Sequence, residues 1–163
     1  MSTRGCIARR TNTKAGPGFK GRYHHWDGYP SGLGKTLFGH FKKDLKAMLK
    51  YLIDDHPAGW STINGADFTK PPGFDSSGPS CYCHGSRSEE GFSVTHKNAS
   101  DSGVEYAYVF EKTTMFVLSS CYKEGGGKMI GMFGCGAEAD KVYWKVIGTV
   151  DLNGKEPKWE KMQ

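Results

Sequence analysis

The spacing of apolar residues predicts one long amphipathic helix over residues 33–53. Within this segment, leucine, phenylalanine and methionine recur at steps of three and four residues, which aligns them along one stripe of a helix. The stripe comprises Leu33, Leu37, Phe38, Phe41, Leu45, Met48, Leu49 and Leu52. Four lysines between residues 42 and 50 fall on the other side, so the helix is expected to bury one face and to expose the other.

Shorter apolar segments with alternating polar positions predict β-strands. They cover residues 4–10, 18–25, 91–96, 104–111, 114–120 and 142–152. Turn-forming residues join the first two segments, and a three-residue turn joins 104–111 to 114–120, so each pair is expected to form a hairpin. Because strands do not alternate with helices, the sequence predicts an α+β fold. We expect a mostly antiparallel sheet of about five or six strands with the helix 33–53 packed on one face.

A chain of 163 residues with 37% hydrophobic content is expected to form a single domain over residues 1–163. Residues 57–90 are rich in proline, glycine and serine, which predicts a long ordered loop region made of short turns. Long ordered loops often carry function, so this segment is also a candidate location for a site.

The net charge of +5 comes from basic residues that are spread along the chain, which is typical of a solvated surface and leaves nucleic-acid binding open. No apolar segment approaches the ~18 residues of a membrane span, and the first residues lack the apolar region of a signal peptide. We therefore expect a cytoplasmic protein without a membrane partner. The five cysteines are expected to be reduced thiols there.

Residues 20–36 combine histidine, tryptophan, aspartate, proline and several glycines directly before the predicted helix. The segment from Gly32 to Thr36 resembles the end of a phosphate-binding Walker A loop, but Tyr29 stands where that motif requires a glycine. The weaker expectation is that the first helical amides, near Gly32 and Gly34, and the side chain of Lys35 attract an anion. The alternative is that Lys35 is an ordinary exposed helix residue.

Aromatic side chains next to basic residues in this segment can stack on a nucleic-acid base. The candidates are Tyr23, Trp26, Tyr29 and Trp60, with Arg22 close in sequence to the first three. The alternative is that Trp26, Tyr29 or both complete the core. The candidate ligand-binding residues are Arg22, His25, Trp26, Asp27, Tyr29, Gly32, Gly34 and Lys35.

Two adjacent histidines and an aspartate make the same segment a candidate for acid–base catalysis or metal binding. His24 and His25 would point to opposite faces of an extended strand, so only one of them can join Asp27 in a single site. If the protein is an enzyme, we expect His24 or His25 to be the general base and Asp27 to orient it.

Cys81, Cys83 and His84 lie within four residues of one another and are ligand types that zinc prefers. Their spacing differs from the common Cys-x-x-Cys knuckle, so a fourth ligand would have to come from elsewhere in the fold. We consider His96, Cys121 and Cys135 as sources of that ligand. The alternative is that these cysteines are plain thiols in an ordered loop and that no cofactor is required.

The first 55 or so residues resemble small proteins of phages, plasmids and other mobile elements. The resemblance rests on the opening Met-Ser-Thr-Arg and on the segment Tyr-His-His-Trp-Asp-Gly-Tyr-Pro at residues 23–30, which precedes an amphipathic helix. It implies a mobile-element setting, and with it the cytosol of a host cell, rather than a mechanism.

Together these observations predict a non-enzymatic binding protein of a phage or mobile element. Inhibition of a host defence system is the role we expect, through a host protein, a nucleic acid or a nucleotide-like signal. One alternative is a small His/Asp-dependent enzyme that acts on a phosphate-containing substrate. The other is an interaction or nucleic-acid-binding module stabilised by zinc at Cys81, Cys83 and His84.

Overall fold

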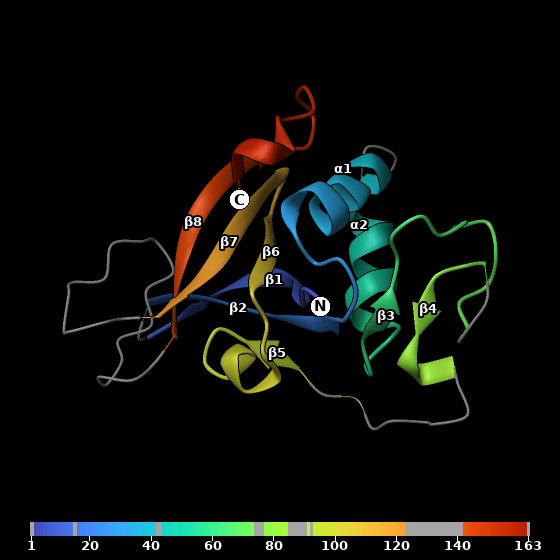
Figure 1. Cartoon of the computed structure of the whole chain (residues 1–163), viewed down its shortest axis with the longest axis horizontal. Helices are drawn as coiled ribbons and strands as arrows, with labels where there is room; N and C mark the ends of the chain where they lie inside the picture. The colour runs from blue at the N-terminus through green and yellow to red at the C-terminus, as the bar shows by residue number, and fades with distance from the viewer. Residues whose placement is uncertain are drawn as a thin grey trace.

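A computed structural model of the chain describes residues 2–14, 16–41, 44–73, 77–84, 91, 93–122 and 142–162. Among these residues, eight strands form one mixed sheet beside short helices, so the α+β class expected from the sequence is confirmed (Figure 1). The strand order is β4-β3-β2-β1-β6-β7-β8, and β5 pairs with β2. The strands are β1 (Gly5–Thr13), β2 (Gly16–His24), β3 (Trp60–Thr62), β4 (Ser80–Cys81), β5 (Val94–Thr95), β6 (Tyr106–Glu111), β7 (Thr114–Tyr122) and β8 (Val142–Asp151).

Both hairpins expected from the sequence are present. β1 and β2 pair antiparallel from Gly5↔His24 to Thr13↔Gly16, and β6, β7 and β8 form an antiparallel meander. The sheet is nevertheless mixed, because β1 and β6 pair in parallel and β2 pairs in parallel with β3. It also has more strands than the expected five or six, because the segment 57–90 contains β3 and β4. Strands of two or three residues are too short to show an alternating pattern in a segment rich in proline, glycine and serine.

The expectation of one long helix over residues 33–53 is wrong. The segment consists of a π-helical turn η1 (Pro30–Gly34), α1 (Lys35–Phe41), α2 (Leu45–Leu49) and a second π-helical turn η2 (Lys50–Asp54). Asp44 has an extended backbone, and its carboxylate accepts a hydrogen bond from the backbone N–H of Ala47. Aspartate is a favoured N-cap, so the chain ends one helix and begins another where the apolar spacing indicates continuity.

The apolar stripe still does what its spacing predicts, because both helical pieces pack on the same side of the sheet (Figure 1). The core has two parts, and alternate strand residues point into each. In β1, Ile7 joins the helical side, whereas Cys6 and Ala8 join the opposite side. The helical side also holds Leu33, Leu37, Phe38, Leu52, Ile53, Trp60, Tyr108 and Trp159.

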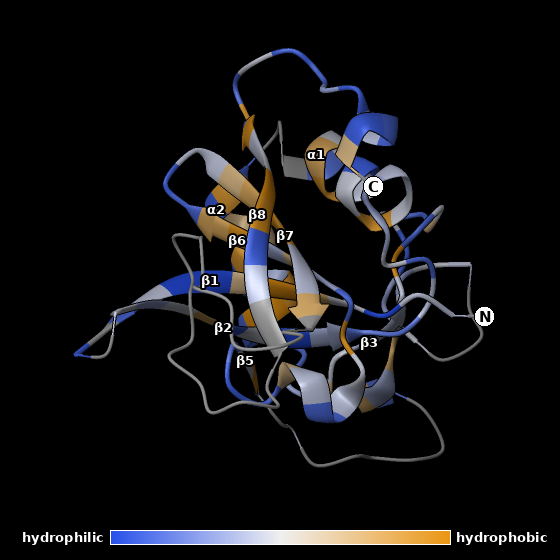
Figure 2. Ribbon diagram, turned by 60° about the vertical axis from the view of Figure 1, so that its left-hand side comes forward, coloured by the Kyte–Doolittle hydropathy of each residue, from blue (hydrophilic) through white to orange (hydrophobic). Residues whose placement is uncertain are grey.

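The tip of the β1–β2 hairpin projects from the rest of the sheet and is hydrophilic (Figure 2). β1 pairs with β6 only from Gly5 to Arg9, and β2 pairs with β5 only at Lys20 and Gly21. Beyond these positions the two strands form a ribbon in which they pair mainly with each other, and the Phe19 carbonyl also accepts a hydrogen bond from the His96 backbone N–H.

The C-terminal segment closes the helical side of the core. Trp159, in the 3-10 helix η5 (Trp159–Met162), is buried and its ring lies 6.0 Å from that of Phe38. A Cβ atom on Gly34 would lie 3.0 Å from the Trp159 ring, so glycine allows the tryptophan to approach the start of α1 closely.

Candidate metal centre

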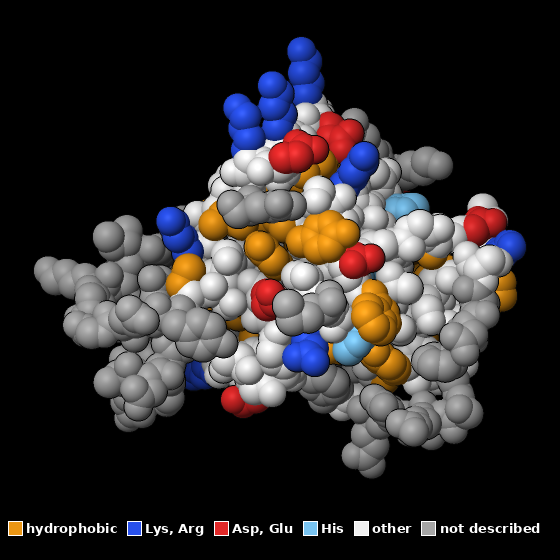
Figure 3. All heavy atoms as spheres, in the orientation of Figure 1, with side chains coloured by type: hydrophobic (Ala, Val, Ile, Leu, Met, Phe, Trp, Pro, Cys, Tyr) orange, Lys and Arg blue, Asp and Glu red, His pale blue; other side chains and the backbone are white. Residues whose placement is uncertain are grey.

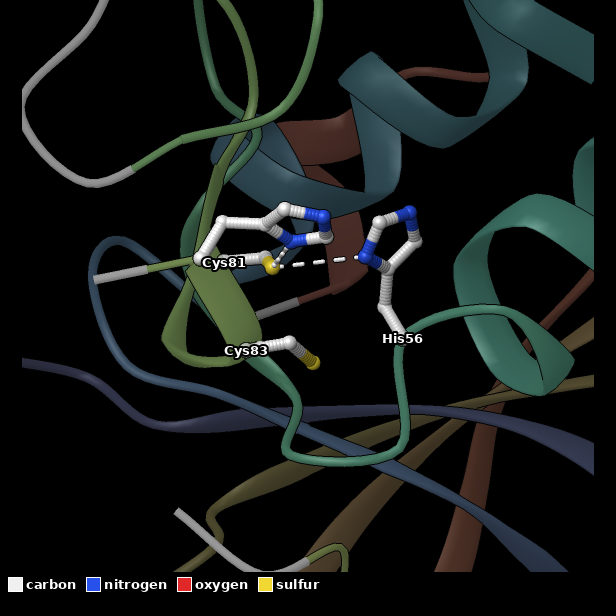
Figure 4. A group of neighbouring side chains, drawn as sticks. His56, Cys81 and Cys83 are labelled. Carbon is white, nitrogen blue, oxygen red and sulfur yellow. Dashed lines mark hydrogen bonds between the residues drawn. The ribbon is translucent and has the colours of Figure 1, made fainter. Parts of the chain in front are cut away.

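Two separate parts of the chain bring four potential metal ligands together. His56 follows η2, whereas Cys81 ends β4 and Cys83 and His84 lie in the 3-10 helix η3 (Tyr82–His84). One ligand atom from each residue can be chosen so that all four lie within 4.8 Å of one another. Figure 4 shows His56 facing Cys81 and Cys83 from the opposite segment.

The distances within the cluster are close to those of a tetrahedral site without matching it throughout. The Sγ atom of Cys81 lies 3.3 Å from Nδ1 of His56 and 2.9 Å from Nδ1 of His84. In a zinc site with bonds of about 2.0–2.3 Å, ligand atoms are roughly 3.3–3.8 Å apart. To admit the ion, Cys81 and His84 would have to separate by a few tenths of an ångström, whereas ligand atoms as much as 4.8 Å apart would have to approach by about 1 Å.

Neighbouring groups hold these ligands in place. The backbone N–H of Ala58 donates a hydrogen bond to Sγ of Cys83 at 3.3 Å, which is the kind of outer contact that orients a metal ligand. The His56 ring packs against Trp60 and Tyr51, with ring centres 4.6 and 4.8 Å apart. The ligand atoms on the short segment 81–84 therefore face His56, whose orientation is fixed by aromatic packing.

Burial controls the charges of the cluster. Burial and the neighbouring Cys83 raise the pKa of the Cys81 thiol to about 12. Burial and the neighbouring His84 lower the pKa of His56, although Asp55 opposes this. His56 is therefore neutral near pH 7, as a metal ligand must be, whereas a metal ion has to displace the Cys81 proton when it binds.

The fourth ligand is a residue that the sequence did not indicate. His96 Nδ1 accepts a hydrogen bond from the Phe19 backbone N–H, Cys121 lies on β7, and Cys135 lies outside the described residues. The cluster instead includes His56, 25 residues before Cys81. The available signal was weak, namely a histidine at the end of a helical segment, directly before proline.

The two histidines of the segment 20–36 lie on opposite faces, as the extended strand predicts. His24 is fully buried, and its Nε2 atom accepts a hydrogen bond from the Ile63 backbone N–H at 3.1 Å. His25 is half-buried, and its Nδ1 atom shares a hydrogen bond of 2.7 Å with the hydroxyl of Tyr23. Burial and, to a smaller extent, the charge of Arg4 lower the pKa of His25. Of the two candidate bases, only His25 is reachable from solvent.

Trp26 and Asp27 are at the surface, where a ligand could reach them. Trp26 is 49% exposed and lines a polar cavity of about 470 Å³. The other lining residues are Ser61, Thr62, Asn64, Gly65, Ala66, Ser77, Gly78 and Ser80. Asp27 has a positive φ of 52°, and its carbonyl accepts hydrogen bonds from Leu33 N and from the Asn64 side chain. The backbone of Asp27 therefore has a clear role in turning the chain.

The candidate anion site at the start of the helical segment has several of its groups already in use. The Gly32 N–H donates to the Tyr29 carbonyl, and Gly34 is buried. Lys35 is exposed. Arg22 points elsewhere, because its Nε donates to the Ile53 carbonyl at 2.6 Å. These residues therefore do not converge on one ligand-sized site with His25 and Trp26.

Basic side chains do not form one continuous patch on the face shown in Figure 3, where lysines gather at the top, over the C-terminal segment. The exposed lysines of the C-terminal segment are Lys155, Lys158 and Lys161.

Comparison of the chain with protein-family models, curated proteins and solved structures finds no match. In the described part of the chain, every helix is too short or too polar to cross a membrane.

Proposed function

We propose that this chain is a zinc-stabilised binding module rather than an enzyme. The observation that carries the proposal is the convergence of two nitrogen and two sulfur donors from His56, Cys81, Cys83 and His84 within 4.8 Å. Imidazole and thiolate are the ligands that zinc selects over magnesium or calcium, which prefer oxygen.

The number of ligands favours a structural role. Catalytic zinc sites keep a coordination position for water and use three protein ligands, whereas structural sites fill a tetrahedron with four. The two cysteines and two histidines supply all four positions. A zinc ion held this way has no position left for a substrate.

The location also supports a structural role. β4 has two residues, and β3 joins the main sheet through a single pair, His24↔Trp60. Such short strands contribute few backbone hydrogen bonds. A metal ion bound by His56 and the segment 81–84 would connect this end of the sheet to the helical segment. It would also stabilise β3 and β4, which have few backbone hydrogen bonds of their own.

Metal analysis of the chain purified without a histidine tag tests the proposal. We expect about one equivalent of zinc per chain, lost in the variants Cys83→Ser and His84→Ala. The matched control is Cys121→Ser, which removes a half-buried thiol on β7 away from the cluster and should retain the zinc. A wild-type protein with no bound zinc, and none taken up from a buffered zinc solution, would contradict the proposal.

The partner of such a module is a further proposal. The resemblance of the N-terminal segment to proteins of mobile elements supports action inside a host cell, on a component of a host defence system. A pull-down from host lysate with the wild-type chain and with a Trp26→Ala variant tests whether the exposed Trp26 ring belongs to the contact surface. Capture of the same host protein by both forms would exclude Trp26 from that surface.

A further inference from the structure

A second cavity, of about 600 Å³, lies next to the metal centre. Its wall is formed by Arg4, Tyr23, Ala58, Tyr82 and the four residues 100–103. These come from the segment before β1, from β2, from η3 and from the 3-10 helix η4 (Ala99–Ser102). The volume falls within the range of about 300–1,000 Å³ that is typical of small-molecule sites.

Arg4 brings a positive charge to the cavity, which Asp101 also lines, and its side chain hydrogen-bonds Tyr23. Its Nε atom is buried and has no hydrogen-bond partner among the described residues. None of the ion pairs in the described part of the chain involves Arg4. A buried guanidinium N–H without an acceptor is costly, and a planar guanidinium is the side chain best suited to a phosphate group.

Two tyrosines add flat apolar surface to the same cavity. Burial raises the pKa of the Tyr23 hydroxyl, and the charge of Arg4 opposes this, which reflects how close the two side chains are. Tyr82 stands in sequence between Cys81 and Cys83, so the metal centre positions its backbone. Aromatic rings beside a cation can stack a nucleobase while the cation binds the attached phosphate.

Part of the cavity wall is polar. Ser100, Asp101 and Ser102 provide two hydroxyls and a carboxylate. Gly103 ends η4 with a φ of 65°, and a Cβ atom there would lie 2.5 Å from Nη1 of Arg4. The positive φ favours glycine at this turn, and a larger residue there would also require the Arg4 guanidinium to shift.

We propose that this cavity binds a nucleoside monophosphate. Arg4 binds the phosphate, Tyr23 and Tyr82 contact the base, and the Asp101 carboxylate accepts hydrogen bonds from the ribose hydroxyls, as acidic residues do in other nucleotide sites. The inference rests on the proposed function, because the zinc ligands on either side of Tyr82 hold that ring at the cavity. It locates the nucleotide-like ligand away from Lys35, where the sequence suggested an anion.

Calorimetric titration of the zinc-loaded full chain tests the inference. The probes are the four ribonucleoside 5′-monophosphates, with inorganic phosphate for comparison. We expect at least one nucleotide to bind more tightly than phosphate and to lose about tenfold or more in affinity in Arg4→Gln. The matched control is Lys35→Ala, which removes an exposed cation outside the cavity and should leave binding unchanged.

A second variant covers the case in which Arg4→Gln does not fold. Ser100 is exposed at the rim, so Ser100→Trp should fill the cavity without disturbing the core and should abolish nucleotide binding. Absence of binding by all four nucleotides at millimolar concentration, equal binding of inorganic phosphate, or unaltered binding by Ser100→Trp would each overturn the inference. A zinc-loaded chain that binds no nucleotide refutes the cavity alone, whereas a chain that binds nucleotide without ever taking up zinc refutes the metal centre.

Discussion

The Tyr108 hydroxyl donates a hydrogen bond of 2.7 Å to the backbone carbonyl of Gly28, and both residues are buried. Tyr108 lies in the middle of β6, and Gly28 lies in the turn between β2 and η1. The bond therefore connects the centre of the sheet to the segment 23–30. It also explains why a buried tyrosine, rather than phenylalanine, occupies this strand position.

We expect Tyr108→Phe to lower the free energy of unfolding by about 1–2 kcal/mol, because the buried Gly28 carbonyl loses a donor that water cannot replace. Urea unfolding followed by circular dichroism measures the change. The control is Tyr106→Phe, on the same strand but only half-buried, which should change the stability by less. Equal effects of the two variants would show that the Gly28 bond contributes nothing specific.

Two glycines are predicted to respond in opposite ways to replacement by alanine, because only one of them has a close neighbour where the added Cβ atom would lie. A Cβ atom on Gly28 would lie 2.6 Å from the backbone nitrogen of Gly5, so Gly28→Ala should destabilise the fold by roughly 1–3 kcal/mol. Gly39 in α1 has nothing within 4 Å of the corresponding position. Gly39→Ala should therefore stabilise the protein by about 0.5–1 kcal/mol. Thermal unfolding of the two variants should show shifts of opposite sign.

His24 should make stability depend on pH. Burial, and to a smaller extent the nearby His25, lower the pKa of His24 to about 3, whereas an unfolded chain has the ordinary value near 6.5. Below about pH 6.5 the unfolded state binds a proton that the folded state rejects, so the free energy of unfolding falls as the pH decreases towards 3, on the order of 1 kcal/mol per pH unit. Above pH 6.5 the contribution is complete and constant.

The variant His24→Gln isolates this effect, because it keeps an acceptor for the Ile63 N–H but cannot take up a proton in this range. Urea titrations of both proteins at pH 7, 6, 5 and 4 should show a shallower decline for the variant. Both proteins share any acid-induced loss of metal, so the difference between them reports His24. Parallel declines would contradict the assignment.

The ion pair between Arg9 and Asp54 should matter little. Its two oxygen–nitrogen distances are 2.7 and 2.9 Å, but the side chains are 40% and 50% exposed. The Arg9 hydrogen bond lowers the pKa of Asp54, so its contribution is present above the ordinary carboxyl pKa and is lost as the pH falls below it. We expect Asp54→Asn to cost at most about 1 kcal/mol, with a smaller difference from wild type in high salt, as measured by urea unfolding.

If the proposed zinc ion is bound, its removal is expected to loosen one end of the sheet rather than the whole molecule. A chelator should leave the far-ultraviolet circular dichroism spectrum of the protein largely unchanged, because the β1–β2 and β6–β8 strands remain folded. Limited proteolysis should then cut between residues 57 and 84 faster than in the zinc-loaded protein. The double variant Cys81→Ser/Cys83→Ser should reproduce that cleavage without a chelator, and uniform cleavage along the chain would argue against a local effect.

Local patterns in the sequence were sufficient for six of the eight strands, but not for β3, β4 or the whole candidate metal centre. The hairpins follow from alternation between closely spaced turns, whose geometry depends on neighbouring residues. The helix prediction failed at Asp44, because apolar spacing continues through a residue whose side chain caps a new helix. Cys81, Cys83 and His84 were identified from their spacing. His56 and Arg4 were not, because each meets its neighbours through strand pairing between distant segments, which no local pattern encodes.

The projecting β1–β2 ribbon has a consequence for association between copies of the chain. An exposed strand edge offers unpaired backbone groups to a second copy, and proteins oppose this with charged side chains on the edge. The ribbon carries Arg10, and Arg9 and Lys20 lie at its base. Arg9 and Arg10 form ion pairs within the same chain. These charges would have to be stripped of water for two ribbons to pair, so the strands that extend furthest from the core are also the ones best protected against aggregation.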